Sequence, residues 1–207
     1  MTTLLIVGAT GLVGGHVLRL ALADPRITRV VAPTRRALPA HAGLENPVVD
    51  FAALDPSAPW WAVDGVVCAL GTTRKAAGSD AAFRRVDVDH VLAVATHARR
   101  AGARAFALNS SVGADAASGN FYLRCKGEAE QGVAALGYPS LTVVRPALIG
   151  GERDEHRPLE ALGAGVMRML GPLVPARYRV VPAERIAVAL LEAALAATPG
   201  LHMRESE

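Results

Sequence analysis

The sequence is poor in cysteine and has no long apolar run. Two cysteines among 207 residues cannot form a disulfide framework, which favours a reducing compartment, and we expect a cytoplasmic protein. The apolar stretch IAVALLEAALAA at 186–197 carries Glu192 and is shorter than the roughly 18 residues of a membrane span. The stretch therefore predicts a packed helix. At the other end, an apolar strand begins at residue 3, and we expect no signal peptide.

Concentrated positive charge and metal-ligand spacing are also missing. Lys and Arg number 22 against 19 Asp and Glu, a net charge of +3, and the arginine pairs are scattered at 35–36, 84–85 and 99–100. This distribution lacks the basic patch of a nucleic-acid-binding protein. His90 and His97 can share a helix face, but no cysteine or carboxylate at ligand spacing completes a metal site. We expect a small-molecule substrate, no nucleic-acid partner, no membrane span, no metal, and a monomer or homodimer.

Apolar runs alternate with segments of helical periodicity along the chain. The pattern predicts strands at 3–9, 27–36, 46–51, 63–73, 103–111 and 140–151, and helices at 11–24, 80–102, 121–137, 158–170 and 183–197. Strands that alternate with helices indicate βαβ units and a parallel sheet. The sequence therefore predicts an α/β protein with the three layers of a Rossmann fold, in which helices flank a doubly wound parallel sheet, and a short C-terminal helical extension.

The first strand-to-helix turn has the composition of a phosphate site. In GATGLVGG, Gly8, Gly11 and Gly14 follow the strand and open the helix. Unpaired amides and the positive end of the helix dipole favour an anion there, and glycine lets a pyrophosphate approach the backbone. The alternative is a turn in which small residues serve packing only. The position at the first strand–helix turn favours nucleotide binding.

The end of the second strand bears on which nucleotide binds. NAD-selective sites place an acid here for the ribose 2′-hydroxyl, but this strand ends in APTRR, with Thr34, Arg35 and Arg36. Guanidinium groups suit a 2′-phosphate, so we expect NADP(H) in preference to NAD(H). The alternative is that both arginines are solvated. Because no low-complexity linker interrupts the chain, we expect one NAD(P)-binding domain over 1–207, with 151–207 contributing a substrate-side extension.

Tyr122 and Lys126 lie four residues apart on the helix predicted at 121–137, and therefore on one face. A nearby ammonium stabilises a phenolate, so the spacing suits an acid/base tyrosine. Both residue types are also ordinary on helix surfaces, and the pair alone does not separate the two interpretations.

These motifs, in this order, resemble the short-chain dehydrogenase/reductase superfamily over residues 3–150. GATGLVG follows the first strand, NSS ends the fifth, YLRCK lies on the next helix and VVRPALIGG forms the sixth strand. The stretches NSSVGADAASGNFYLRCKGEAEQGV and RPALIGGER are similar to an atypical branch, the Tat-interacting-protein-like oxidoreductases, and to chains described as nucleoside-diphosphate-sugar epimerase-like.

The resemblance implies roles for individual residues. Tyr122 would be the general acid/base, Lys126 would assist it and bind the nicotinamide ribose, and Ser111 would bind the substrate oxygen, with Ser110 as the alternative. Asp87 stands where the superfamily has a relay asparagine, which leaves the relay open. The motifs and the resemblance together give these expected cofactor contacts: Gly8, Thr10, Gly11, Leu12, Val13, Gly14, Thr34, Arg35, Arg36, Asp50, Phe51, Leu70, Gly71, Thr72, Thr73, Tyr122, Lys126 and Pro146.

Three functions are compatible with these motifs. The first is an NADP(H)-dependent oxidoreductase acting on a small carbonyl or alcohol. The second is a nucleotide-sugar epimerase or dehydratase, which normally needs a larger C-terminal lobe than the residues after 150 supply. The third is an NADPH-binding regulatory protein with little turnover. Turnover of a carbonyl substrate would distinguish the first from the third, and activity on a nucleotide sugar would favour the second.

Overall fold

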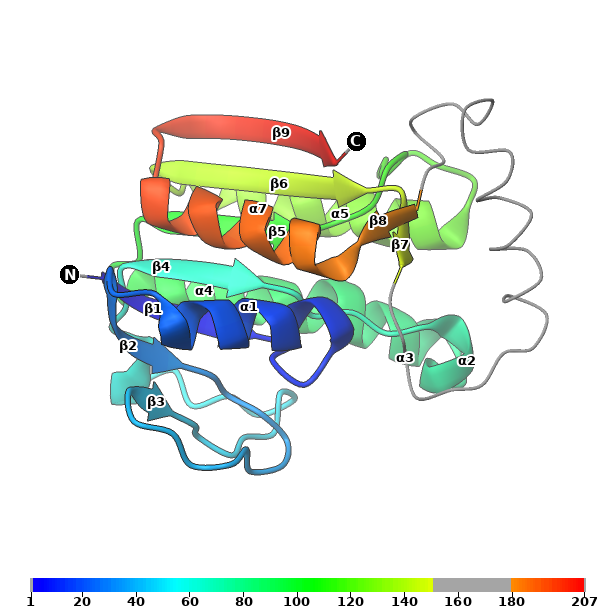
Figure 1. Ribbon diagram of the computed structural model, residues 1–207. Coiled ribbons are helices and arrows are strands. Elements are labelled where there is room, and N and C mark those ends of the chain that lie inside the picture. The colour runs from blue at the N-terminus through cyan, green and yellow to red at the C-terminus, as the bar shows by residue number, and fades with distance from the viewer. Residues whose placement is uncertain (1, 151–179, 207) are drawn as a thin grey trace.

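The computed structural model describes residues 2–150 and 180–206, and a parallel sheet forms its centre (Figure 1). The sheet has seven strands in the order β3-β2-β1-β4-β5-β6-β9. The order reverses between β1 and β4, as in a Rossmann fold, where ligands bind at the carboxyl ends of the strands. The predicted doubly wound parallel sheet is confirmed. The strands are β1 (Thr2–Val7), β2 (Ile27–Val31), β3 (Leu44–Glu45), β4 (Gly65–Cys68), β5 (Ala105–Asn109), β6 (Ser140–Pro146) and β9 (Gly200–Ser206).

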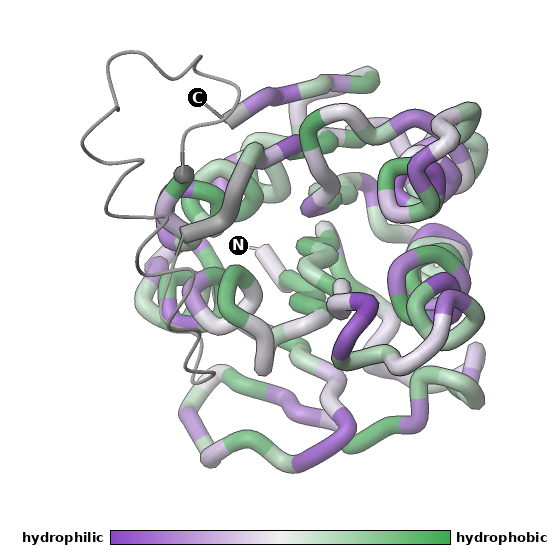
Figure 2. Tube along the Cα trace, turned by 90° about the vertical axis from the view of Figure 1, so that its right-hand side faces the viewer, coloured by the Kyte–Doolittle hydropathy of each residue, from purple (hydrophilic) through white to green (hydrophobic). Residues whose placement is uncertain are grey.

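Helices cover both faces of this sheet and give the predicted three layers. Helices α1 (Leu12–Ala23) and α7 (Ala183–Ala196) bury apolar side chains against one face, with Val17 and Ile186 completely inaccessible. Helices α4 (His90–Arg100) and α5 (Phe121–Ala135) do the same on the other face, through Val94 and Val133. Figure 2 views this arrangement from the edge where the strands end. No helix within the described ranges combines the length and apolarity of a membrane span.

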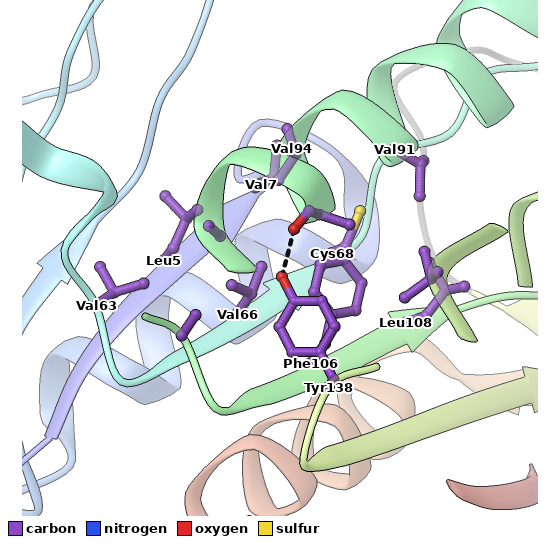
Figure 3. Close-up of a cluster of buried hydrophobic side chains, with 14 of the residues drawn as sticks. Leu5, Val7, Val63, Val66, Cys68, Val91, Val94, Phe106, Leu108 and Tyr138 are labelled. Carbon is purple, nitrogen blue, oxygen red and sulfur yellow. Dashed lines mark hydrogen bonds between the residues drawn. The ribbon is translucent and has the colours of Figure 1, made fainter. Parts of the chain in front are cut away.

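The core between the sheet and α4 includes a polar group, the hydroxyl of Tyr138 (Figure 3). It donates a hydrogen bond to the carbonyl oxygen of Ala95 at 2.6 Å. Burial raises the pKa of Tyr138, so the phenol stays a neutral donor. Phe106 packs beside it, with ring centroids 5.1 Å apart, and these contacts fix the loop before β6 against α4.

The prediction of the third strand is wrong. The segment 46–51 does not form a strand. Strand β3 is the shorter Leu44–Glu45, and Val48 contributes one isolated bridge to Thr34. Pro47 lacks the amide that a strand needs, and the side chain of Asn46 bonds the carbonyl of Ala32 at 2.5 Å and the amide of Leu38 at 2.7 Å. These bonds hold a loop at the place where we expected a ladder.

The chain after β6 also differs from the prediction. The predicted strand at 140–151 ends at Pro146, and a separate pair of parallel strands follows, β7 (Leu148–Gly150) and β8 (Val180–Pro182). Strand β9 was not predicted, and with α7 it places residues 183–206 in the sheet and its helix layer. The helix expected at 158–170 and residues 151–179 of the proposed substrate-side extension lie outside the described residues.

The long helix predicted at 80–102 is present but changes its winding. Helix α3 (Asp80–Arg84) passes through a π-helical segment (Arg85–Asp89) into α4. A π turn inserts one extra residue and often marks a functional site. Two further short helices precede these elements, a 3-10 helix at Pro59–Trp61 and α2 at Arg74–Ala77.

Candidate cofactor and catalytic site

The glycines of the first turn have different physical roles. Gly8 has φ +86°, and a Cβ there would lie 2.5 Å from the carbonyl oxygen of Ala69. A Cβ on Gly14 would overlap the carbonyl oxygen of Gly8. Both glycines therefore allow the start of α1 to pack closely against the ends of β1 and β4, so the packing interpretation holds for these two.

Gly11 leaves room for a ligand. It is exposed, it has ordinary extended angles (φ −84°, ψ 170°), and it begins α1 without a side-chain cap. The first amides of α1 are thus open to an external acceptor such as a phosphate. Thr10 is also exposed, Leu12 is half-buried against the core, and Val13 is buried in it, so Val13 can contribute only through its backbone.

The loop after β2 carries two exposed guanidinium groups. Arg35 and Arg36 are exposed. Thr34 is only 4% exposed, and its hydroxyl donates to the carbonyl of Arg36 at 2.6 Å and accepts from Asn46 at 2.8 Å. The Thr34 side chain therefore shapes the loop, and the two arginines remain the predicted contacts of a 2′-phosphate.

Several other expected cofactor residues have local partners. Asp50 accepts a hydrogen bond from the amide of Ala52 at 2.9 Å, and Thr73 caps α2 by accepting from Ala76 at 3.1 Å. Phe51 and Leu70 pack against the core below α4. These contacts account for the position of each side chain without a ligand. Contacts between these residues and the cofactor remain predictions.

Lys126 lies at the centre of the polar cluster where β4 ends. Its Nζ is 2.7 Å from Asp87 Oδ1, and Asp87 Oδ2 accepts the backbone amide of Thr72 at 2.9 Å. Both side chains are deeply buried, with Lys126 7% and Asp87 1% exposed. A Cβ added to Gly71 would lie 3.7 Å from Lys126 Nζ. The structure thus brings Gly71, Thr72 and Lys126 together, with Asp87 between them.

The charge of Lys126 is maintained despite its burial. Desolvation opposes the ammonium, but the Asp87 carboxylate, the phenol of Tyr122 and a hydrogen bond to Asp87 outweigh it and raise the pKa of Lys126. Lys126 Nζ lies 5.9 Å from the centre of the Tyr122 ring. Tyr122 is half-buried and packs against Phe83, with ring centroids 5.9 Å apart. A cation is therefore held beside a phenol on α5.

The π-helical segment explains how Asp87 reaches the site. Within Arg85–Asp89, Asp87 and Val88 are buried, whereas Arg85 and Asp89 face solvent. The carboxylate that stands in place of a relay asparagine is thus an ion-pair partner of Lys126. Sequence reasoning marked this position but missed the pairing, because a π turn cannot be recognised from apolar periodicity.

The two serines after β5 face different environments. Ser110 is 4% exposed, and its hydroxyl donates to Glu130 on α5. Ser111 is half-buried, and within residues 2–150 and 180–206 its hydroxyl donates only to the neighbouring carbonyl of Val112, at 3.3 Å. Pro146 accepts the amide of Val112 at 3.0 Å. Ser110 is therefore engaged inside the protein, which favours Ser111 as the predicted substrate contact.

Glu130 and Arg145 were not among the predicted site residues. Arg145 donates to Glu130 through Nε at 3.0 Å and through Nη2 at 2.5 Å. Two signals in the sequence pointed to them. Glu130 follows Lys126 by four residues on the same helix face, and Arg145 is the one charged residue of strand β6.

Comparison with known proteins agrees with the fold. Residues 4–131 match the model of the NAD dependent epimerase/dehydratase family. The chain belongs to this family. It is an NAD(P)-binding member of the atypical short-chain dehydrogenase/reductases, and the resemblance seen in its motifs is confirmed.

The chain is similar to curated proteins of fungi and rat, and its fold is similar to that of a solved structure. Protein fmp52, mitochondrial, of Emericella nidulans is 36% identical over 179 residues, which span 83% of this chain and 77% of that protein. Protein HTATIP2 of Rattus norvegicus is 41% identical over 162 residues, 76% of this chain and 66% of that protein. A putative NAD-dependent epimerase/dehydratase from Bacillus halodurans superposes with a TM-score of 0.72 at 20% identity, over 99% of this chain and 93% of that one.

The expectation of a cytoplasmic protein is wrong in the light of these relatives. Four fungal relatives at 35–37% identity are named as mitochondrial proteins. The expectation rested on the low cysteine content, which indicates a reducing environment and does not distinguish one reducing compartment from another.

Proposed function

We propose that this family member is an NADP(H)-dependent oxidoreductase that interconverts a small carbonyl and its alcohol, with Tyr122 as the general acid/base. The observation that carries the proposal is the buried ammonium of Lys126 beside the Tyr122 ring, 5.9 Å from its centre. An ammonium costs free energy to bury. Its retention here by Asp87 supports a role that needs a fixed positive charge.

The residues around the first turn fit a dinucleotide. Gly8 and Gly14 bring α1 close to the sheet, and the exposed Gly11 leaves its start open to a pyrophosphate. Arg35 and Arg36 lie exposed beyond β2, where guanidinium groups suit a 2′-phosphate. The chemistry that a bound nicotinamide supplies is hydride transfer.

The side chains of the chain supply the proton and hold the substrate oxygen. In the reducing direction, the hydroxyl of Tyr122 donates its proton to the carbonyl oxygen. Ser111 donates a hydrogen bond to the same oxygen as negative charge develops on it. Lys126 stabilises the phenolate that remains, and Asp87 keeps Lys126 charged and in place.

Turnover of a panel of aldehydes and ketones with NADPH tests this proposal. Tyr122→Phe removes only the hydroxyl, so turnover should fall by about 10²–10⁴-fold while NADPH binding stays nearly intact. Tyr138→Phe is a matched control, because this tyrosine donates to Ala95 inside the core. Its turnover should equal that of the wild type in the folded variant.

Three outcomes would contradict the proposal. Equal turnover by Tyr122→Phe and the wild type would remove the proton donor. Activity confined to a nucleotide sugar would support the epimerase or dehydratase alternative, and NADPH binding without any turnover would support a regulatory protein.

A further inference from the structure

We infer that Glu130 and Arg145 are positioning residues of this site, which hold Ser110 inward and thereby present Ser111 to the substrate. The inference rests on the proposed function, because it assigns a purpose to the segment that carries Ser111. That segment, residues 110–120, connects β5 to α5 and is called the serine loop below.

A buried carboxylate joins three elements at this point. Glu130 is 7% exposed and lies on α5. It accepts the hydroxyl of Ser110 from the start of the serine loop, and it accepts two hydrogen bonds from Arg145 on β6. Charge-assisted bonds of this kind are directional and stronger than neutral ones, so the hydroxyl of Ser110 has a fixed direction away from the substrate side.

Arg145 also bonds the serine loop directly. Its Nη2 donates to the carbonyl oxygen of Ala114 at 3.1 Å. The same guanidinium therefore holds both Glu130 and the middle of the loop. An arginine can do this because its donors form a rigid planar fork, which a lysine cannot reproduce.

Helix α5 holds the other side of the serine loop. A Cβ on Gly127 would overlap the backbone nitrogen of Ala116, so the helix and the loop are in direct backbone contact. The amide of Asp115 donates to the carbonyl of Leu123 at 3.1 Å, and Arg124 donates to the carbonyl of Ser118 at 2.9 Å. The loop is thus fixed to the helix that carries Tyr122 and Lys126.

Helix α5 carries both Glu130, which bonds the serine loop, and the predicted catalytic residues. Tyr122, Lys126 and Glu130 are four residues apart in turn and share one face of the helix. Lys126 bonds Asp87 on the β4 side, and Glu130 bonds Ser110 and Arg145 on the β6 side. One rigid helix therefore sets the positions of the tyrosine and of the loop that carries Ser111, which is what two donors to one substrate oxygen require.

Two variants and a matched control test the inference. Glu130→Gln removes the charge and keeps an acceptor for Ser110. Glu130→Leu combined with Arg145→Met removes the pair without leaving a lone buried charge. The control is Glu192→Gln on α7. The carboxylate of Glu192 also pairs with an arginine, Arg26, at 2.5 Å, but its side chain is 48% exposed.

Amide hydrogen exchange of the NADPH-free proteins measures the loop without any substrate. Exchange in the serine loop should accelerate by at least about tenfold in the double variant, because it loses both the bond from Ser110 to Glu130 and the bond from Arg145 to Ala114, and losing one charge-assisted hydrogen bond corresponds to about 10–150-fold. Amides of β1 in the same variant should keep their rates, and the control should match the wild type. Unchanged exchange in the serine loop of the folded double variant would overturn the inference.

Kinetics then test the assignment of the two serines. With a substrate from the carbonyl panel, Glu130→Gln should lower kcat about tenfold and leave the Kd of NADPH unchanged. In a protein that is merely destabilised, turnover and the amount of NADPH bound would both fall in proportion to the unfolded fraction. Ser111→Ala should cost more turnover than Ser110→Ala, and the reverse order would overturn the inference. If no carbonyl is turned over, the proposed function fails, and the exchange result still decides whether Glu130 and Arg145 hold the loop.

Discussion

The ammonium of Lys126 and the carboxylate of Asp87 lie 2.7 Å apart where both side chains are almost completely buried. The second oxygen of Asp87 accepts the amide of Thr72. One carboxylate therefore connects the helix that carries the tyrosine, the π-helical segment before α4 and the loop after β4. Any substitution of Asp87 should therefore change both the stability and the activity of the protein.

Asp87→Ala should lower the free energy of unfolding by about 3–5 kcal/mol, because it leaves a buried ammonium without its partner. Urea denaturation of the wild type and the variant measures this difference. The control is Asp89→Ala, whose carboxylate is 59% exposed and pairs with Arg84 at 3.2 Å, and which should change stability by less than about 1 kcal/mol. Equal losses in the two variants would show that the buried pair has no special role.

Stability should also depend on pH through Lys126. The folded protein raises the pKa of Lys126 above the ordinary value of 10.5. The pair therefore contributes fully below pH 10.5, and this contribution is lost as the pH rises through the raised folded value. Lys126→Met with Asp87→Leu should remove this part of the alkaline dependence, which unfolding curves collected over an alkaline series would reveal. A slope identical to that of the wild type would contradict the prediction.

Gly11 and Gly14 of the first turn should respond differently to substitution. Gly11→Val adds an exposed side chain whose Cβ would lie 3.3 Å from the carbonyl oxygen of Gly8, a contact that a small shift relieves, so NADPH binding should be lost while the chain stays folded. Gly14→Ala places a Cβ over the carbonyl of Gly8 and should destabilise the fold itself. Thermal unfolding and NADPH fluorescence titration separate the two effects. Unchanged NADPH affinity in folded Gly11→Val would show that this turn serves packing only.

Cofactor selectivity should depend on the loop after β2. Each charge-assisted contact to a 2′-phosphate contributes about 1.5–3 kcal/mol, so Arg35→Ala with Arg36→Ala should weaken NADPH binding much more than NADH binding. Titration of both cofactors measures the two affinities. The control is Arg104→Ala, which replaces an exposed arginine directly before β5 and should change neither affinity. A wild type that binds NADH and NADPH equally would contradict the expected preference.

The cysteines should be unreactive in the folded protein. Burial raises the pKa of Cys68 to about 11 and also raises that of Cys125, so little thiolate forms at mildly alkaline pH. A thiol reagent should label neither residue until denaturant is added. Rapid labelling of the native protein would show that one of these sites opens to solvent.

The sequence predicted the order of the layers because apolar runs and helix-ending glycines mark parallel strands and their crossovers clearly. It did not predict β9, since Leu201 and Met203 are exposed on an edge strand and alternate with polar residues in a short terminal segment. It placed the third strand too late, because Val48 and Val49 suggest a ladder while the deciding bonds come from the side chain of Asn46.

The candidate site shows the same division. The glycine turn and the Tyr122–Lys126 spacing are local patterns, so the sequence alone contains them. The partners Asp87, Glu130 and Arg145 become neighbours only when separate elements pack together. The direction of Ser110 depends on that packing too, which is why the sequence left the choice between the two serines open.

Two roles are assigned to Lys126, binding the nicotinamide ribose and stabilising the phenolate of Tyr122, and measurements of binding and turnover separate them. Removing this lysine alone would leave Asp87 buried and unpaired, so the informative variant is Lys126→Met with Asp87→Asn. If Lys126 binds the nicotinamide ribose, the Kd of NADPH should rise by about 10–150-fold, the range for a lost charge-assisted hydrogen bond. Turnover at saturating NADPH should fall as well, because no cation then stabilises the phenolate of Tyr122. Asp87→Asn alone keeps the Lys126 side chain and is the control, and a double variant that binds NADPH as tightly as this control would show that Lys126 does not contact the cofactor.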